Sequence, residues 1–304
     1  MSRNVNLHRA KKEKNDEFYT GLSDIEKELI HYKDHFKGKV VYCNCDGPDS
    51  NFVKYFTDNF EQLGLKKLIV SGYTLKDNNV DIDFRSKEAI TLLKEADIVV
   101  TNPPFSLFRE YVKQLVEHDK KFLIIGNNNA IICKEIFHLV KDNKIWLGYN
   151  SNKTMEFQLA DDYKKWNRIE NGKKYGKVPA ISWFTNLDIS KRHEDLILYK
   201  TYNSNDFPIY DNYNAINVDK VKDIPNDYDG IMGVPITFMN KYSPDQFDII
   251  GIANGNTRTS TSQEILKSLN YRIHPNDKGG CGIINGKIKY PRILIKKVTK
   301  EVTK

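Results

Sequence analysis

Several features that mark whole classes of proteins are absent from this sequence. Its 304 residues contain four cysteines, too few for a disulfide scaffold in a chain of this length. No hydrophobic run approaches the length of a membrane span, and the first residues lack the apolar core of a signal peptide. Because 29% of the residues are charged and 39% are hydrophobic, we expect a globular cytoplasmic protein.

Acidic residues are fewer than basic ones. The chain has 40 Asp and Glu against 47 Lys and Arg, which gives a formal net charge of +7. This excess favours a polyanionic partner such as nucleic acid, although many lysine-rich proteins bind nothing anionic. Residues 1–15 form a basic N-terminal arm, which is either disordered or in contact with phosphates.

The cysteines give little indication of a metal site. Cys43 and Cys45 form a C-x-C on an expected strand, and no second pair stands at zinc-ligand spacing. We therefore expect buried structural thiols and no bound metal.

Short apolar runs alternate with amphipathic segments through the first half of the chain. The expected strands are residues 38–45, 67–71, 96–101, 121–125 and 144–147. The expected helices are residues 23–35, 51–63, 87–94, 107–117 and 133–141. Ser23 and Glu26 have the spacing of a capping box at the start of the first helix. The alternation predicts an α/β fold with a doubly wound, mostly parallel sheet.

After about residue 150 the helical periodicity fades, and Asn, Tyr, Lys and Gly become frequent. The expected strands here are residues 178–185 and 196–202, together with residues 231–239 and 247–252 as a candidate pair. No internal repeat and no Gly/Ser linker separates the two halves, so we expect them to pack together. Their boundary is placed anywhere between about residues 145 and 190.

The tetrapeptide Asn102-Pro103-Pro104-Phe105 follows the expected strand 96–101. It therefore lies at the carboxyl end of a parallel strand, where open α/β sheets bind ligands. Two successive prolines fix the backbone and remove two N–H donors, so the carbonyl groups of the turn can accept hydrogen bonds from a ligand. Asn102 adds a side-chain acceptor and Phe105 a flat apolar face, which suits a planar ligand with an exocyclic amino group. The simpler alternative is an ordinary Pro-Pro turn.

A site that methylates such an amine has few requirements. The exocyclic nitrogen of adenine is a poor nucleophile because its lone pair is conjugated with the ring. Acceptors for its hydrogens, here the Asn102 side-chain oxygen and the Pro103 carbonyl, favour a more tetrahedral nitrogen, while Phe105 stacks on the base. Asp46 and Asp83 follow other expected elements at the same sheet edge, so they and Asn102 are expected to share one crevice that binds S-adenosylmethionine. Phe84 is expected to cover the adenine ring of that cofactor. The alternative for both acids is a solvated turn residue.

These motifs resemble those of the EcoRI-type adenine-specific DNA methyltransferases. The stretches that carry the resemblance are residues 16–20, 41–46, 50–52, 83–86, 97–108, 233–238 and 246–251. The resemblance implies a Rossmann-like methyltransferase fold that uses S-adenosylmethionine. It places Phe18, Tyr19 and Thr20 near the methionine end of the cofactor, Asp46 in the strand-end cofactor motif, and Asp83 with Phe84 in the adenine pocket. The usual glycine-rich turn is replaced by Asp46-Gly47-Pro48-Asp49, and no acid directly follows Ile69-Val70-Ser71.

The resemblance implies an S-adenosylmethionine-binding catalytic core at residues 16–150. Residues 151–304 are expected to complete the sheet and to carry target recognition. The predicted reaction is N6 methylation of an adenine flipped out of a specific duplex DNA sequence. Candidate phosphate contacts, each of which could instead be a solvated surface charge, are Lys164, Lys165, Arg168, Lys173, Lys174, Arg258, Lys287 and Lys289.

Alternative functions are methylation of RNA or of a protein glutamine, and regulation by a DNA-binding protein that has lost catalysis. The predicted partner is double-stranded DNA, and a cognate restriction endonuclease is a candidate partner in function only. The chain is expected to act as a monomer.

Overall fold

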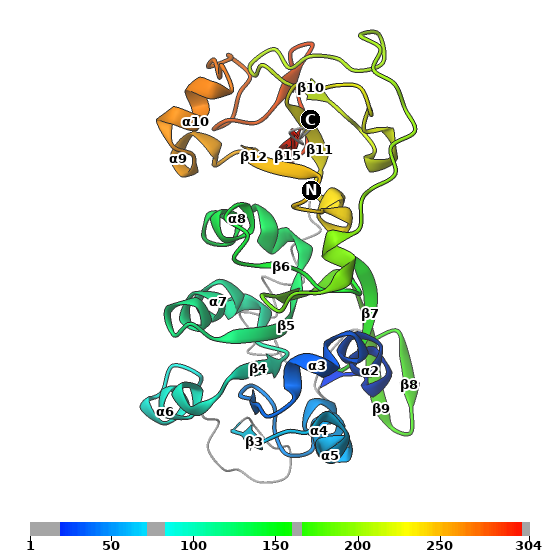
Figure 1. Ribbon diagram of the computed structural model, residues 1–304, viewed down its shortest axis with the longest axis vertical. Helices are drawn as coiled ribbons and strands as arrows, with labels where there is room; N and C mark the ends of the chain where they lie inside the picture. The colour runs from blue at the N-terminus through cyan, green and yellow to red at the C-terminus, as the bar shows by residue number, and fades with distance from the viewer. Residues whose placement is uncertain (1–18, 72–82, 160–165, 300–304) are drawn as a thin grey trace, which may run out of the picture. The chain divides into compact units, whose positions relative to one another are not determined.

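The computed structural model describes residues 19–71, 83–159 and 166–299. It is a mixed α/β protein with two compact units (Figure 1). The first unit comprises the described residues up to Ala130 together with Ile145–Ile189, and the second comprises Ile131–Lys144 and the described residues from Ser190 onward. The basic arm at residues 1–15, Phe18, Lys164 and Lys165 lie outside the described residues.

Among the described residues, the first unit is built on a nine-stranded sheet with the order β1-β7-β9-β5-β4-β2-β3, in which β6 and β8 also pair with β9. The strands are β1 (Tyr19–Thr20), β2 (Val40–Cys43), β3 (Lys67–Val70), β4 (Ile98–Thr101), β5 (Lys121–Asn127), β6 (Trp146–Leu147), β7 (Lys153–Leu159), β8 (Arg168–Glu170) and β9 (Lys173–Thr185). Neighbouring strands among β3, β2, β4 and β5 are parallel, as their alternation with helices predicted. The strands that pair with β9 or β7 at the other side are antiparallel.

Helices cover both faces of this sheet (Figure 1). They are α2 (Leu22–Leu29), η1 (Ile30–Tyr32), α3 (Lys33–Phe36), α4 (Asn51–Asp58), α5 (Phe60–Leu63), α6 (Lys87–Glu95), η2 (Phe105–Leu107) and α7 (Phe108–Glu117). Helices α4 and α6 begin after serine caps: Ser50 Oγ accepts the Val53 N–H at 3.2 Å, and Ser86 Oγ accepts the Ala89 N–H at 3.1 Å.

The capping box predicted for Ser23 and Glu26 is wrong. Helix α2 begins at Leu22, so Gly21 is the N-cap and no side chain caps the helix. The chain leaves β1 at Thr20 and turns directly into the helix, with the Asp24 N–H bonded to the Gly21 carbonyl at 3.1 Å. Strand pairing therefore decides where the helix starts, and Ser23 lies inside its first turn.

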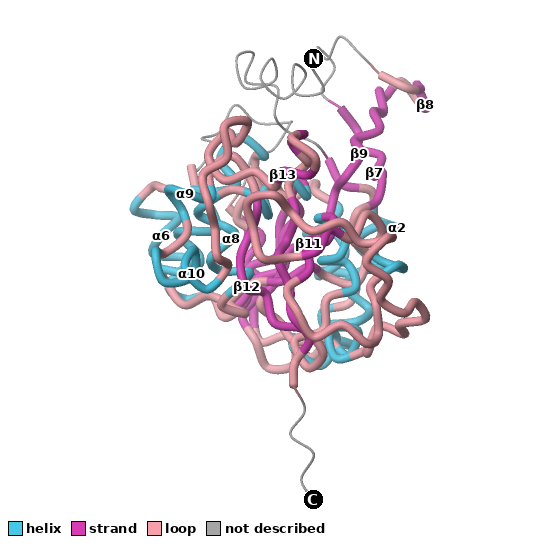
Figure 2. Tube along the Cα trace, turned by 90° about the horizontal axis from the view of Figure 1, so that it is seen from above, coloured by secondary structure: helices cyan, strands magenta, loops and turns pink. Residues whose placement is uncertain are grey.

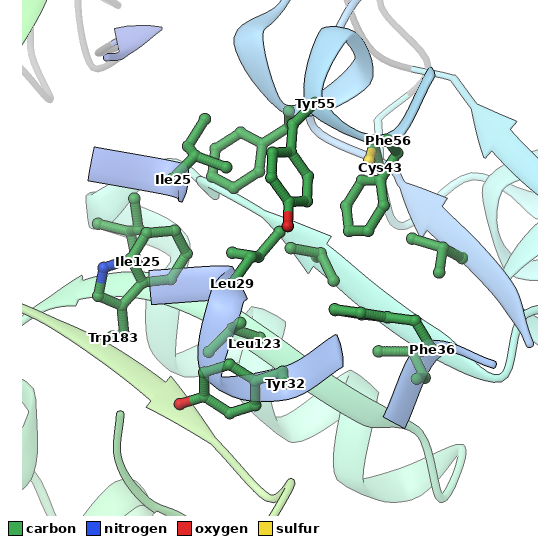
Figure 3. Packing of buried hydrophobic residues seen from close by; sticks show 14 of the residues in the cluster. Ile25, Leu29, Tyr32, Phe36, Cys43, Tyr55, Phe56, Leu123, Ile125 and Trp183 are labelled. Carbon is green, nitrogen blue, oxygen red and sulfur yellow. The ribbon is translucent and has the colours of Figure 1, made fainter. Parts of the chain in front are cut away.

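Alternate residues of the central strands face opposite helix layers. Val41 and Cys43 of β2 belong to the core cluster formed with α2 and α4. Tyr42, between them, is bonded through its hydroxyl to Ser71 Oγ at the end of β3. Figure 3 shows the packing of that cluster, with labelled side chains from the helices and the sheet: Ile25, Leu29, Tyr32, Phe36, Cys43, Tyr55, Phe56, Leu123, Ile125 and Trp183. On the other face, the Phe108 ring of α7 meets the Phe184 ring of β9 edge-on at 5.0 Å.

The part of the second unit that the structure describes contains a four-stranded sheet with the order β10-β11-β15-β12 and a small hairpin of β13 and β14. Its elements are α8 (Lys134–Lys141), η4 (Ser190–His193), β10 (Ile216–Asn217), η5 (Val221–Asp223), β11 (Met232–Pro235), η6 (Ile236–Lys241), β12 (Phe247–Ala253), α9 (Thr257–Ser260), α10 (Gln263–Ser268), β13 (Ile283–Ile284), β14 (Lys287–Ile288) and β15 (Arg292–Lys297).

Two predictions for this half of the chain are wrong. The expected pair at residues 231–239 and 247–252 does not form, because β15 lies between β11 and β12 and pairs with both; Ile293, for example, is opposite Val234 and Ile252. The strand expected at residues 196–202 is also not formed. Instead, the Gln246 side chain bonds both the N–H and the carbonyl of Leu196, at 2.7 and 2.8 Å. The backbone polar groups of Leu196 are therefore hydrogen-bonded without a neighbouring strand.

Candidate active site at the carboxyl ends of the parallel strands

Strands β2 and β4 lie side by side, and their carboxyl ends bring Asp46 and Asn102 together. The Asp46 carboxylate accepts hydrogen bonds from the hydroxyls of Thr101 and Ser50 and from the Asn102 backbone N–H. Thr101 Oγ1 also accepts the Cys45 N–H at 3.2 Å. One hydroxyl thus joins the turn after β2 to the start of the Asn-Pro-Pro-Phe motif.

The Asp46 side chain is buried, with only 8% of the residue exposed. Burial raises the pKa of Asp46 to about 7, against the opposing effect of the hydrogen bonds from Thr101, Ser50 and Asn102. All three donors, two hydroxyls and one backbone amide, are neutral. The carboxylate would therefore be stabilised by a cationic group of a ligand placed beside it.

The side chain of Asn102 is oriented by the N-terminal strand. Its Nδ2 donates to Thr20 Oγ1 at 3.3 Å, although the two residues are 82 positions apart. The Thr20 carbonyl in turn accepts from Asn51 Nδ2 at 2.8 Å, which ties β1 to the first residue of α4. Thr20 is buried, whereas Tyr19, the other residue of β1, is half-buried.

The rest of the tetrapeptide forms a turn that opens a short 3₁₀-helix. Pro103 is buried and Pro104 is half-buried, and the Pro104 carbonyl accepts the Leu107 N–H at 3.0 Å. Phe105 begins η2 and is half-buried, with its ring edge-on to the buried Phe157 ring of β7 at a centroid distance of 6.3 Å.

Asp83 and Phe84 precede α6 and have different surroundings. The Asp83 carboxylate is held by Arg85, whose Nε donates to Oδ1 at 2.8 Å, and this interaction lowers the pKa of Asp83. Phe84 is buried, and its ring meets the Tyr111 ring edge-on at 5.1 Å. The Tyr111 hydroxyl donates to Asn44 Oδ1, so Tyr111 links Phe84 to the end of β2.

Several residues of this network were not predicted from the sequence: Ser50, Asn51, Thr101, Asn44 and Tyr111. Thr101 is the last residue of β4, and Asn44 directly follows β2. The sequence signal for both was a polar residue at the end of an apolar run. Ser50 acts twice, as the N-cap of α4 and as a donor to Asp46. Tyr111 lies on the apolar side of α7 and carried no signal beyond core packing.

Three narrower findings concern the cysteines, metal binding and membrane spans. All four cysteines are free thiols, and Cys43 belongs to the core, where burial raises the pKa of its thiol well above the usual value. Within residues 19–71, 83–159 and 166–299, no group of three or more His, Cys, Asp or Glu is arranged to hold a metal ion. In the same residues, no helix has the length and apolar character needed to cross a membrane.

A parallel sheet that ends in an Asn-Pro-Pro-Phe turn beside a buried carboxylate is the arrangement expected of an amino-group methyltransferase. A family model described as "Adenine-specific methyltransferase EcoRI" matches residues 6–82 and 75–298. The chain is 46% identical to the type II methyltransferase M.EcoRI of Escherichia coli, in an alignment that covers 97% of this chain and 98% of the relative.

Two mycoplasma proteins are also similar over nearly their whole length. The chain is 42% identical to the type II methyltransferase M.MgeORF184P of Mycoplasma genitalium, with 96% of this chain and 98% of the relative covered. It is 41% identical to the type II methyltransferase M.MpnI of Mycoplasma pneumoniae, with coverage of 95% and 97%. No solved structure matches the chain. The chain therefore belongs to the EcoRI family of adenine-specific methyltransferases, which confirms the resemblance inferred from its motifs.

Proposed function

We propose that the protein transfers a methyl group from S-adenosylmethionine to the N6 amino group of an adenine flipped out of a specific duplex DNA sequence. Its family membership makes it an adenine-specific DNA methyltransferase. The observation that carries the more detailed proposal is the network in which Thr101 joins the buried Asp46 to the backbone turn that begins at Asn102.

The chemistry of Asp46 fits the proposed cofactor. S-adenosylmethionine supplies the transferable methyl group on a sulfonium and also carries an α-ammonium group. Asp46 is a buried carboxylate with neutral hydrogen-bond donors, so a nearby cation would favour its charged form. We assign Asp46, Tyr19 and Thr20, together with Phe18, to the methionine end of the cofactor.

The opposite end of the cofactor is assigned to Asp83 and Phe84. The buried Phe84 ring is supported by Tyr111 and offers an apolar surface for the adenine of the cofactor. Asp83 keeps a lowered pKa beside Arg85, so it stays ionised as an acceptor at neutral pH.

The four residues of the turn are assigned to the target base. Asn102 accepts one hydrogen of the adenine amino group through its side-chain oxygen, and Pro103 accepts the other through its carbonyl. The two acceptors favour a more tetrahedral nitrogen, whose lone pair is then available to attack the methyl carbon. Pro104 restricts the backbone of the turn, and Phe105 stacks on the base.

The proton balance of the reaction requires no dedicated base. As the nitrogen bonds the methyl carbon, the methyl–sulfur bond would break and its electron pair would stay on the sulfur of S-adenosylhomocysteine. The nitrogen, now positively charged, then loses one of its two protons to water. The departing proton is already hydrogen-bonded to the Asn102 side-chain oxygen or to the Pro103 carbonyl, so an acceptor is in place when it leaves the nitrogen.

Access to the amine requires that the adenine leave the base stack, which costs a few kcal/mol. Stacking of a base on an aromatic side chain contributes about 1–3 kcal/mol, so Phe105 offsets much of this cost. Residues 151–304 are proposed to complete the sheet and to carry target recognition. The pairing of β7 and β8 with β9, and of β9 with β5, supports the first part.

The test is transfer of a labelled methyl group from S-adenosylmethionine to duplex DNA, with RNA and protein as parallel acceptors. We expect label in N6-methyladenine of DNA. Label in RNA or in protein glutamine, with none in DNA, would show that the amine belongs to another molecule. DNA binding without label in any acceptor would indicate a regulatory protein that has lost catalysis.

We further propose that the protein acts as a cytoplasmic monomer and protects DNA from a cognate restriction endonuclease, its partner in function. The type II names of its relatives support the second part. Light scattering of the free and DNA-bound protein tests the oligomeric state, and sequencing of modified adenines in cells that express the protein identifies the protected sequence.

A further inference from the structure

The antiparallel side of the first sheet continues as a narrow extension. We call it the β-ribbon: β7 together with the described residues 166–178, which hold β8 and the first part of β9. Phe157 of β7 is paired with Gly176, and Arg168 of β8 is paired with Tyr175. All three residues of β8 are exposed, and Figure 2 shows β8 with the adjoining ends of β7 and β9 extending beyond the helices of this unit.

The base of the β-ribbon touches the proposed catalytic turn at two points. The buried Phe157 ring packs edge-on against Phe105 at 6.3 Å. Phe157 is also paired with Thr20, whose hydroxyl accepts the hydrogen bond from Asn102 Nδ2. Whatever lies along the β-ribbon therefore lies next to the residues assigned to the target base.

The β-ribbon is basic. Its residues, 153–159 and 166–178, contain five lysines and arginines against two glutamates, so they carry a large share of the chain's net charge of +7. The carboxylates of Glu156 and Glu170 both pair with Arg168, with N–O distances of 2.7 and 2.6 Å. Lys173 and Lys177 are exposed and lie on one face of β9, because side chains two and four positions apart share a face of a strand.

Exposed apolar and aromatic groups accompany this charge. Trp166 is 45% exposed, and its ring lies 4.5 Å from Lys174 Nζ. Ile169, in the middle of β8, is 57% exposed. The Arg168 guanidinium lies 4.1 Å from the centre of the Tyr175 ring. Cations that bind phosphates, next to flat rings that contact bases and sugars, are typical of nucleic-acid surfaces.

We propose that the β-ribbon is a DNA-contacting element that lies along the duplex beside the flipped adenine. Lys173 and Lys177 bind backbone phosphates, and Trp166 makes an aromatic contact with the nucleic acid. The proposal rests on the proposed function, since it takes duplex DNA to be the substrate.

The dimensions of the β-ribbon agree with this assignment. Lys173 is three residues beyond Gly176, the partner of Phe157, which corresponds to about 10 Å along an extended strand. The same length spans about three base-pair steps of duplex DNA.

The test compares two double variants that remove the same charge. Lys173→Ala with Lys177→Ala changes the β-ribbon. Lys39→Ala with Lys66→Ala is the matched control, because both lysines are exposed and directly precede β2 and β3, at the edge of the sheet opposite the proposed active site. Dissociation constants are measured at several salt concentrations for a duplex that the wild-type protein methylates.

We expect the β-ribbon variant to bind about tenfold or more weakly. The plot of log K against log salt should become shallower by about 1 to 2, since each lost phosphate contact removes about 0.9 from the slope. The control should bind like the wild type. Methyl transfer at saturating DNA and affinity for S-adenosylmethionine should be unchanged in both variants, and Lys173→Arg with Lys177→Arg should restore binding.

A wild-type affinity and salt slope in the β-ribbon variant would overturn the inference. If that variant also formed oligomers, its lysines would serve to keep an exposed strand edge from pairing with other chains. Failure of the proposed function is a separate result, because the wild-type protein would then methylate no DNA at all.

Trp166 gives an independent readout. We expect addition of DNA to change the tryptophan emission of the wild-type protein and expect Trp166→Phe to abolish most of that change. Of the other two tryptophans, Trp183 is only 1% exposed, and Trp146 is half-buried with its Nε1 bonded to the Leu187 carbonyl. An equal change in the Trp166→Phe protein would place the DNA elsewhere.

Discussion

Thr101 Oγ1 donates a hydrogen bond to the Asp46 carboxylate, although the two residues are 55 positions apart in the chain. Thr101 is the last residue of β4, and Asp46 follows β2, so this bond ties together the ends of two neighbouring parallel strands. Asn102 comes next after Thr101, and its backbone N–H bonds the same carboxylate. The residue proposed to hold the target amine and the residue proposed to hold the cofactor are therefore positioned by one network.

Asp46→Asn should change how stability depends on pH. The pKa of Asp46 is raised from 3.8 to about 7 in the folded protein, so the folded state holds a proton that the unfolded state has lost. The stability contributed by this residue is fully present below about pH 4 and is lost as the pH rises to about 7, by up to about 1.4 kcal/mol per pH unit. Urea unfolding of the ligand-free wild-type and Asp46→Asn proteins from pH 4 to pH 8 measures this loss of stability.

The free energy of unfolding of the wild type, relative to that of Asp46→Asn, should fall between about pH 4 and about pH 7. Above that range the difference between the two proteins should stay constant. The variant should also bind S-adenosylmethionine about tenfold or more weakly, because a hydrogen bond to a charged group is worth about 1.5–3 kcal/mol. Parallel pH profiles for the two proteins would contradict the buried, proton-holding state of Asp46.

Thr101→Val should destabilise the protein by about 1–3 kcal/mol, since it leaves the N–H of the half-buried Cys45 without its hydroxyl acceptor. It should also raise the pKa of Asp46 further, because the hydrogen bond from Thr101 lowers that pKa. The pH-dependent part of the unfolding free energy should then extend to higher pH. Thr101→Ser keeps the hydroxyl and serves as the control; equal profiles for the valine and serine variants would remove the assigned role of the hydroxyl.

Asn102→Ala should reduce the rate of methyl transfer in a single turnover by about 100-fold or more, the usual size of the loss of one polar contact to a reacting group. Affinity for duplex DNA and for S-adenosylmethionine should stay within a few-fold of the wild type. Quench-flow measurement with labelled cofactor gives the rate, and titration gives the affinities. An unchanged rate would exclude Asn102 as an acceptor for the target amine.

Phe105→Leu should weaken the capture of the flipped base, while Phe105→Tyr, which keeps the ring, should preserve it. Loss of stacking is worth about 1–3 kcal/mol, which corresponds to a drop of about 5- to 150-fold in kcat/KM for DNA. Fluorescence of 2-aminopurine at the target position reports the flipped state directly. Because Phe105 also packs on Phe157, unfolding curves of both variants separate a stability effect from a binding effect.

Local sequence patterns predicted the parallel half of the first sheet well. The apolar runs at β2, β3, β4 and β5 are short and bounded by polar turns, and each is followed or preceded by an amphipathic helix. Strands β2, β4 and β5 are buried on both faces, so their residues are nearly all apolar and easy to recognise, whereas β3 at the edge is partly exposed. The proximity of Asp46 to Asn102 followed from the same reasoning, since the carboxyl ends of neighbouring parallel strands meet at one edge.

The antiparallel strand pairings were harder to predict from local sequence patterns. Nothing in residues 231–252 indicates that β15, from the end of the chain, inserts between β11 and β12. The start of α2 at Leu22 likewise depends on the pairing of Thr20 with Phe157, which lies more than a hundred residues away. Register and strand order depend on contacts between distant segments, which a local pattern does not encode.

The sequence by itself determined the family and the alternation of strands and helices, and it predicted the chemistry of the Asn-Pro-Pro-Phe turn. These depend on residue types at fixed short spacing, and short spacing is preserved in any fold. Only the tertiary structure decided that Thr101 bonds Asp46, that Thr20 orients Asn102, and that Phe157 joins the β-ribbon to Phe105. Each of these contacts joins segments more than fifty residues apart, and it exists because the sheet brings their strands side by side.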